Sequence, residues 1–383
     1  MAVASTGNFR RFERFSVVLC IVSLLLVPVF VAVHPPLGQT VHDLVVPGLP
    51  KGADLSTVML LIVAIVGTTV APWQLFFQQS YVIDKRITPR FLQYERADLA
   101  IGIVFVMVGA IAIMALAAAT FHGRPEFGNF ADAGAVAAGI GKYAGHVPGV
   151  LFALALIDAS IIGAAAVSLA SAYALGDVLS FNHSLHRKVT DAPAFYAVYL
   201  GLIALAAVLV VVPGVPLGLL TNAVQALAGV LLPSATVFLL LLCNDKAVLG
   251  PWTNPGWLNA LATLIVGVLV ILSAILTATV LFPQVDVTTL TEVLFGMLVL
   301  GLAVAGPYAS RGNVGRRLDI PRGAHTPRPP RIVREHWTMP QLELLDKPVW
   351  SRTRKVGMIT LRGYLVIAVL MLIVKAIELG IGH

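Results

Sequence analysis

The sequence predicts an all-α integral membrane protein with about nine transmembrane helices. Of the 383 residues, 58% are hydrophobic and only 12% are charged, whereas soluble domains carry about 25% charged residues. Nine segments are apolar over the ~20 residues that a membrane-spanning helix needs. Most of these segments are apolar all round rather than on one face, which is typical of helices in lipid or inside a bundle.

The nine segments follow one another along the chain. They are Phe15 to Val33, Val58 to Tyr81, Leu99 to Phe121, Val150 to Leu175, Ala194 to Val212, Ala223 to Cys243, Leu258 to Phe282, Leu290 to Tyr308 and Leu361 to Leu379. We therefore divide the chain into a cytoplasmic N-terminus (1–14), an eight-helix membrane domain (15–309), a basic cytoplasmic loop rich in proline and arginine (310–360), and a final transmembrane helix with a tail (361–383).

The second segment is broken in its middle by residues 67–74, Gly-Thr-Thr-Val-Ala-Pro-Trp-Gln. A helix in hydrocarbon must satisfy its backbone groups internally, so a break is tolerated only where the freed groups face protein, water or a ligand. Transporters present such freed groups to ions near the bilayer midplane, although a plain proline kink is the alternative. The polar residues around the break favour a binding site; they are Thr68, Thr69, Gln74, Gln78 and Gln79.

Loop charge predicts the orientation. Basic residues gather before the first segment and after the second, fourth and eighth, at Arg10, Arg11, Arg14, Lys85, Arg86, Arg90, Arg96, Arg187, Lys188 and from Arg311 to Lys355. By the positive-inside rule, this pattern places the N-terminus in the cytoplasm and the C-terminus outside. The basic loop is interpreted as a solvated segment near anionic lipid, not as a nucleic-acid arm.

Several function classes are disfavoured by missing motifs. The sequence has no H-E-x-x-H pair and no Cys/His cluster, and it has neither a Walker A loop nor G-x-G-x-x-G. These are the patterns of zinc hydrolases and of nucleotide sites. We therefore expect neither an enzyme nor an ATP-driven pump, and no bound cofactor.

The broken segment carries a resemblance to a known family. The run from Gly67 to Gln78 resembles the sixth transmembrane helix of the natural-resistance-associated macrophage protein (NRAMP) family of divalent-metal transporters. The family's pattern there is glycine, alanine, threonine, valine, methionine, proline, histidine, asparagine. The charged opening Phe12-Glu13-Arg14 resembles the start of the fifth helix.

A second match supports the resemblance. Asn222, Gln225 and Pro233, followed by the polar loop Cys243 to Lys246, resemble the family's tenth helix, in which a glutamine stands eight residues before a proline. The likeness covers roughly Asn8 to Trp257.

The resemblance implies a LeuT-like fold of two inverted five-helix repeats. In this register the chain begins at the fifth helix, and no Asp-Pro-Gly motif occurs in the sequence. The resemblance therefore implies an N-terminally incomplete transporter, with a separate chain as one possible source of the first four helices. A divalent cation needs a charged oxygen ligand, which the family supplies from its first helix.

The resemblance also implies a metal site. Thr68 stands where the family uses a backbone carbonyl, and Gln225 stands where it uses an amide oxygen. Ala71 replaces the family's methionine, a soft ligand suited to transition metals, as in the NRAMP-related magnesium transporter branch. Trp73 and Gln78 replace two histidines, which argues against proton coupling, although core packing explains Trp73 equally well.

Asp158 is a further candidate that the family motif does not include. It lies inside the fourth segment, where a carboxylate costs at least ~2.5 kcal/mol and is rarely kept without a partner. We interpret it as a metal ligand in the ion path in preference to a structural group bonded to a neighbouring helix. Asp177, near the end of the same segment, is interpreted as interfacial.

The resulting expectation is transport of a divalent cation, Mg²⁺ or Mn²⁺, across the inner (cell) membrane. The ion is expected at the unwound helix near Thr68 and Ala71, with Gln225 and Asp158 as further ligands. The expected partners are the bilayer, the cation and a chain carrying the first helices. Two alternatives stay open: a truncated or split chain that is inactive alone, and an organic-solute transporter of the same fold.

Overall fold

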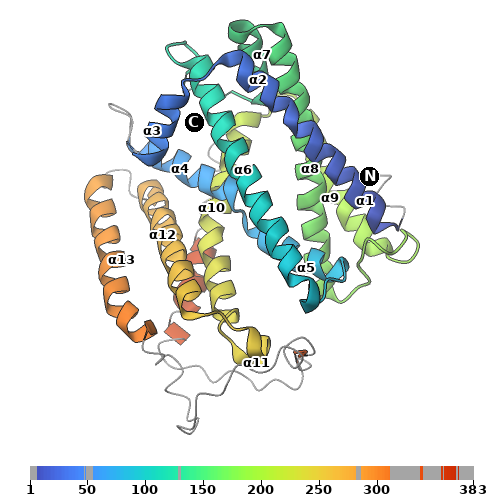
Figure 1. The fold of residues 1–383 in the computed structure, drawn as a ribbon, viewed down its shortest axis with the longest axis vertical. Helices are drawn as coiled ribbons and strands as arrows, with labels where there is room; N and C mark the ends of the chain where they lie inside the picture. The colour runs from blue at the N-terminus through green and yellow to red at the C-terminus, as the bar shows by residue number, and fades with distance from the viewer. Residues whose placement is uncertain are drawn as a thin grey trace. The chain divides into compact units, whose positions relative to one another are not determined.

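The computed structural model describes residues 7–46, 48, 55–127, 131–281, 286–310, 337–339, 355–356, 358–367 and 370. All regular secondary structure within these residues is helical (Figure 1). The chain divides into two compact units, Met1–Pro50 with Trp73–Thr221, and Lys51–Pro72 with Asn222–His383. We call them the first and the second unit and describe each by itself.

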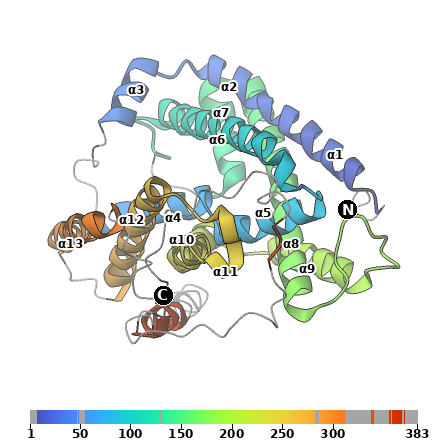
Figure 2. The ribbon, with the colours of Figure 1, turned by 60° about the horizontal axis from the view of Figure 1, so that its bottom comes forward.

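The first unit is built around one long helix. Its helices are α1 (Phe9–Val22), α2 (Leu26–Val33), α3 (Leu37–Val45), α5 (Pro72–Asp84), α6 (Leu92–Phe121), α7 (Ala133–Ala144), α8 (His146–Leu179) and α9 (Pro193–Val211). Helix α8 packs against α1, α2, α7 and α9. Figures 1 and 2 show α1 and α2 as one rod, which is interrupted by the 3-10 turn Ser23–Leu25.

Two apolar clusters hold the first unit together. One joins the start of α1 to the end of α8 and to α9, with Phe9, Tyr173 and Phe195 at its centre and Phe77 of α5 packed against it. The other joins α2, α6, α7 and α8. Buried aromatic side chains dominate the first cluster, and each such side chain removes a large apolar area from its surroundings.

The second unit contains α4 (Leu55–Thr69), α10 (Leu217–Leu242), α11 (Lys246–Leu249), α12 (Gly256–Leu281) and α13 (Val287–Ser310). Helix α12 packs against both α4 and α13, with Ile271 and Ile275 in the contact. A described helical stretch near the end of the chain also belongs here, because the Tyr364 hydroxyl donates to the Val230 carbonyl of α10 over 3.0 Å.

The predicted helical membrane class is confirmed. Six helices of the described residues are long and apolar enough to cross a membrane: Phe9–Val33, Pro89–Phe121, His146–Leu179, Pro193–Val211, Leu217–Leu242 and Gly256–Ile275. Each corresponds to a predicted segment. The predicted eighth segment lies within α13, Val287–Ser310, and the start of the ninth is the apolar helix Met358–Ile367. Most of the rest of the ninth, and most of the basic loop 310–360, lie outside the described residues.

The sequence patterns did not predict α3 and α7. Both are shorter than a membrane span, at 9 and 12 residues, so a search for ~20-residue apolar segments passes over them. The start of helix α7 is set by an N-cap. The Asp132 carboxylate accepts the Ala135 N–H over 2.7 Å, which satisfies one of the free amides at the helix start.

Candidate functional site

The second apolar segment is interrupted in the structure at residues 70 and 71. Helix α4 ends at Thr69, Val70 and Ala71 are not helical, and α5 begins at Pro72. The carbonyl of Thr68 would accept the N–H of residue 72 in a continuous helix, but a proline has no N–H. The Thr68 carbonyl is therefore released from the helical ladder, while Val70 N–H still donates to the Val66 carbonyl over 3.0 Å.

The last turn of α4 lies against α10 within the second unit. A Cβ added to Gly67 would lie 2.8 Å from the Gly229 Cα and would overlap the Gln225 carbonyl oxygen and the Gly229 nitrogen. Only a residue without a side chain allows two helix backbones to approach so closely. Gly67, the residue before Thr68, therefore packs against the backbone of α10 at Gln225 and Gly229.

The other residues at the break are small or packed. Ala71 is 4% exposed and contributes only a methyl group. Trp73 is half-buried, and its ring lies 6.1 Å from the ring of Phe77, one turn further along α5. This contact agrees with the packing interpretation of Trp73. Gln78, at the second family histidine position, is exposed.

Asp158 lies in the first unit, at the middle of α8, and is 4% exposed. Its Oδ2 accepts the Ser23 hydroxyl over 3.0 Å, and Ser23 begins the 3-10 turn between α1 and α2. Its Oδ1 is buried and has no hydrogen-bond partner among the described residues. An ionised carboxylate can accept about four hydrogen bonds, so Asp158 is under-satisfied. No sequence pattern indicates a role for Ser23, which is one serine in an apolar run.

The predicted ligands therefore fall into two groups. Thr68, Ala71 and Gln225 belong to the second unit, and Asp158 belongs to the first. Across the part of the chain that the structure describes, no group of three or more His, Cys, Asp or Glu side chains could hold a metal ion. The oxygen that lies at the α4–α10 crossing is the backbone carbonyl of Gln225, which is neutral.

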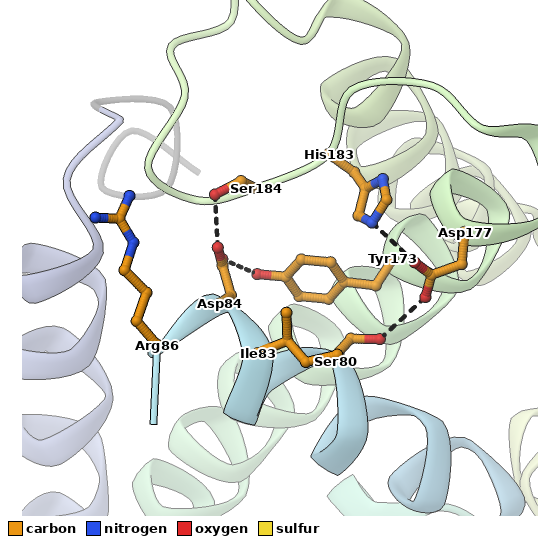
Figure 3. A pocket seen from close by; sticks show the side chains of 8 residues that line it. All are labelled: Ser80, Ile83, Asp84, Arg86, Tyr173, Asp177, His183 and Ser184. Atoms are coloured by element: carbon orange, nitrogen blue, oxygen red, sulfur yellow. Dashed lines mark hydrogen bonds and ion pairs between the residues drawn. The ribbon is translucent and has the colours of Figure 1, made fainter. Parts of the chain in front are cut away.

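A second polar site, which the sequence patterns did not predict, lies where α5 ends. It surrounds a cavity of about 120 Å³ lined by Ser80, Ile83, Asp84, Arg86, Tyr173, Asp177, His183 and Ser184. Figure 3 shows how these side chains lie. We call it the Asp84 cluster. It joins α5, α8 and the α8–α9 connection, residues 180–192, within the first unit.

Asp84 is the centre of this cluster. Its carboxylate accepts the Tyr173 hydroxyl and the Ser184 hydroxyl, each over 2.5 Å, and the Leu185 N–H over 2.9 Å. Asp177, interpreted from the sequence as interfacial, accepts from His183 Nε2 over 3.0 Å and from the Ser80 hydroxyl over 3.4 Å. These residues stand far apart in the sequence and belong to no motif, so only the fold brings them together.

The chain is similar to a family of known proteins. A family model described as natural resistance-associated macrophage protein-like matches residues 1–279 of the 383. This stretch includes the helix break, α10 and most of α12.

Individual relatives agree with the family match. A divalent metal cation transporter MntH of Aeromonas hydrophila is 26% identical over 254 residues, which are 63% of this chain and 56% of that protein. A protein with the same name from Xylella fastidiosa is 29% identical over 281 residues, 70% of this chain and 56% of the relative. The chain thus spans about half the length of the curated relatives that it matches.

Proposed function

Because the chain belongs to the natural resistance-associated macrophage protein-like family, whose members are transporters and not enzymes, we propose that it takes part in moving divalent metal cations across a membrane. The relatives that it matches are named divalent metal cation transporters. The observation that carries the proposal is the helix break, where Pro72 releases the Thr68 carbonyl one residue from the contact between Gly67 and Gln225.

The proposed fold is the LeuT-like inverted repeat that the family resemblance implies. In this assignment α4 and α5 are the two halves of the family's broken sixth helix, and α10, which continues through Pro233, is its tenth. Broken helices that meet an intact helix near mid-membrane are the usual ion sites of such transporters. The six long apolar helices support a membrane-embedded bundle.

The proposed metal site uses oxygen donors at the α4–α10 crossing. The Thr68 backbone carbonyl and the Gln225 side-chain amide supply them, and Ala71 lines the site at the break. Mg²⁺ prefers oxygen ligands and keeps several of its waters, whereas a thioether favours softer metals. Because Ala71 supplies no sulfur, we propose that the site favours Mg²⁺ over Cd²⁺ and over softer transition metals.

We further propose that Asp158 takes a cation on the ion's path. The support comes from the first unit alone: the carboxylate is buried, one hydroxyl donates to it, and the described residues offer its Oδ1 no partner. A buried carboxylate with so few donors is costly. A positive charge beside Oδ1 would remove that cost.

The test is uptake into liposomes that contain the purified chain, with and without a co-expressed segment carrying the first four helices of a relative. Mg²⁺ and Mn²⁺ uptake should be saturable and should fall in Gln225→Ala but not in Gln93→Ala, an exposed glutamine on α6. Uptake that Gln225→Ala leaves unchanged would contradict the proposed site. Uptake of amino acids in place of metal ions would contradict the proposed substrate.

A further inference from the structure

The α8–α9 connection is bound to the end of α5 by Asp84. The Ser184 hydroxyl and the Leu185 N–H donate to the Asp84 carboxylate, and His186 Nε2 lies 3.0 Å from the Asp84 carbonyl oxygen. Three consecutive residues of the connection therefore hold the last residue of α5. The Tyr173 hydroxyl fixes the same carboxylate from α8, as Figure 3 shows.

The conformation of this connection depends on His183, which precedes the three residues. Its Nδ1 lies 2.8 Å from the Phe181 carbonyl oxygen, and its Nε2 lies 3.0 Å from Asp177 Oδ1. A carbonyl oxygen only accepts hydrogen bonds, and so does an ionised carboxylate. Both contacts are hydrogen bonds only when both ring nitrogens carry a proton, as they do in the imidazolium form.

The position of the His183 ring is set by a glycine. A Cβ added to Gly176 of α8 would overlap the ring atoms Cγ and Nδ1 and would lie 2.8 Å from the His183 Cβ. The ring also packs edge-on against Tyr173, with 6.2 Å between the ring centroids. The ring is therefore seated on the backbone of α8, and its Nε2 is directed at Asp177 one residue further along that helix.

We propose that residues 180–192 form a proton-operated latch, in which cationic His183 keeps the α8–α9 connection closed on α5 through Asp84. The titratable groups that contact the ring are Asp177 and Tyr173 of α8. Asp84 and Arg86 at the end of α5 line the same cavity, and His186 of the connection lies against the Asp84 carbonyl and stacks on Phe9.

Loss of one proton opens the latch. The neutral ring carries one proton, so either Nδ1 faces the Phe181 carbonyl at 2.8 Å or Nε2 faces the Asp177 carboxylate at 3.0 Å with no hydrogen between the two atoms. Two acceptors at such a distance repel each other, so the ring moves away from Gly176. The Ser184 and Leu185 donors move with it, and Asp84 keeps only Tyr173.

The link to transport rests on the proposed function. Helix α5 is the second half of the broken helix and follows Ala71 directly in the chain. The latch therefore acts on the helix that follows the proposed metal site in the chain. The latch itself is testable without transport, so its failure and the failure of the proposed function are distinct.

The experiment is hydrogen exchange of the purified full chain in nanodiscs, between about pH 5 and about pH 8.5, corrected for intrinsic exchange rates. Wild-type amides of residues 180–186 and of the end of α5 should exchange about tenfold to a hundredfold faster at the upper pH, as expected when one charge-assisted hydrogen bond is lost. Equal corrected protection at both ends of this range would overturn the latch.

Variants of His183 distinguish the effect of its positive charge from the effect of its side-chain packing. His183→Gln should exchange fast at every pH, and His183→Arg, which is permanently charged, should retain part of the protection and lose the pH dependence. His146→Gln, an exposed histidine at the other end of α8, should behave as wild type. A His183→Gln chain that keeps the wild-type pH response would overturn the assignment of the switch to this residue.

Discussion

Gly67 of α4 and Gln225 of α10 touch through their backbones, with no space for a side chain at position 67. Thr68, whose carbonyl loses its helical donor at Pro72, follows directly. The break and the crossing therefore belong to one feature. The chain is opened at the point where it meets the helix that carries the candidate amide ligand.

Gly67→Ala should destabilise the second unit. The added methyl overlaps backbone atoms that cannot rotate away, so α4 must move from α10 at a cost of about 1–3 kcal/mol. Thermal unfolding of the detergent-purified chain measures this. Gly102→Ala on α6, where an added Cβ meets nothing within 4 Å, is the matched control, and equal melting temperatures for the two variants would contradict the close crossing.

Ala71→Met should shift metal preference towards soft ions. A thioether at the break adds a ligand that Cd²⁺ and Mn²⁺ accept better than Mg²⁺ does. Competition of Cd²⁺ against Mg²⁺ in the uptake assay should strengthen in this variant and stay unchanged in Val70→Met, the exposed neighbouring position. If Cd²⁺ competes with Mg²⁺ equally well in the wild type, in Ala71→Met and in Val70→Met, Ala71 does not line the site.

Asp158→Asn should reduce cation uptake by at least about tenfold at normal membrane levels, since it keeps the shape of a ligand and removes its charge. Poor yield and aggregation of this variant would instead mean that Asp158 is structural. Unaltered uptake with normal yield would contradict both interpretations.

Ser23→Ala should cost about 1–3 kcal/mol in the wild-type background, because it removes the hydroxyl that donates to the buried Asp158 carboxylate. The same change should cost less in Asp158→Asn, where no charge is left to stabilise. A double-mutant cycle on thermal unfolding measures the coupling. Additive effects of the two substitutions would show that the Ser23–Asp158 bond does not stabilise the fold.

The turn before α7 should open in acid. The Tyr143 hydroxyl, and after it Lys142, lower the pKa of Glu126 from its ordinary value. A carboxyl whose pKa is lowered by folding contributes stability above its unfolded pKa and loses it as pH falls through the lower folded value. Exchange of α7 amides should therefore rise as pH drops below the ordinary glutamate range. Glu126→Gln should remove this dependence, and an unchanged acid response would contradict it.

The sequence supported the membrane class and the helix break for physical reasons. A long apolar segment in lipid forms a helix, because a helix satisfies its own backbone hydrogen bonds. The helix breaks at Pro72, because proline has no N–H to donate to the Thr68 carbonyl. The contact of Gly67 with Gln225 was not predictable, because it depends on how two helices about 160 residues apart cross. The Asp84 cluster was not predictable either, because it depends on how α5, α8 and the α8–α9 connection pack. A single serine, tyrosine or aspartate in a helical sequence does not indicate such a cluster.

The most direct test of the α4–α10 metal site is metal-directed cleavage of the full chain. Fe²⁺ with ascorbate and peroxide cuts a protein backbone close to the bound ion, and mass spectrometry locates the cuts. We expect cuts within residues 67–71 and 222–229 that excess Mg²⁺ or Mn²⁺ suppresses and that Gln225→Ala reduces, while Gln93→Ala leaves them unchanged. Cuts that fall elsewhere, or that neither cation suppresses, would contradict a divalent-cation site at the broken helix.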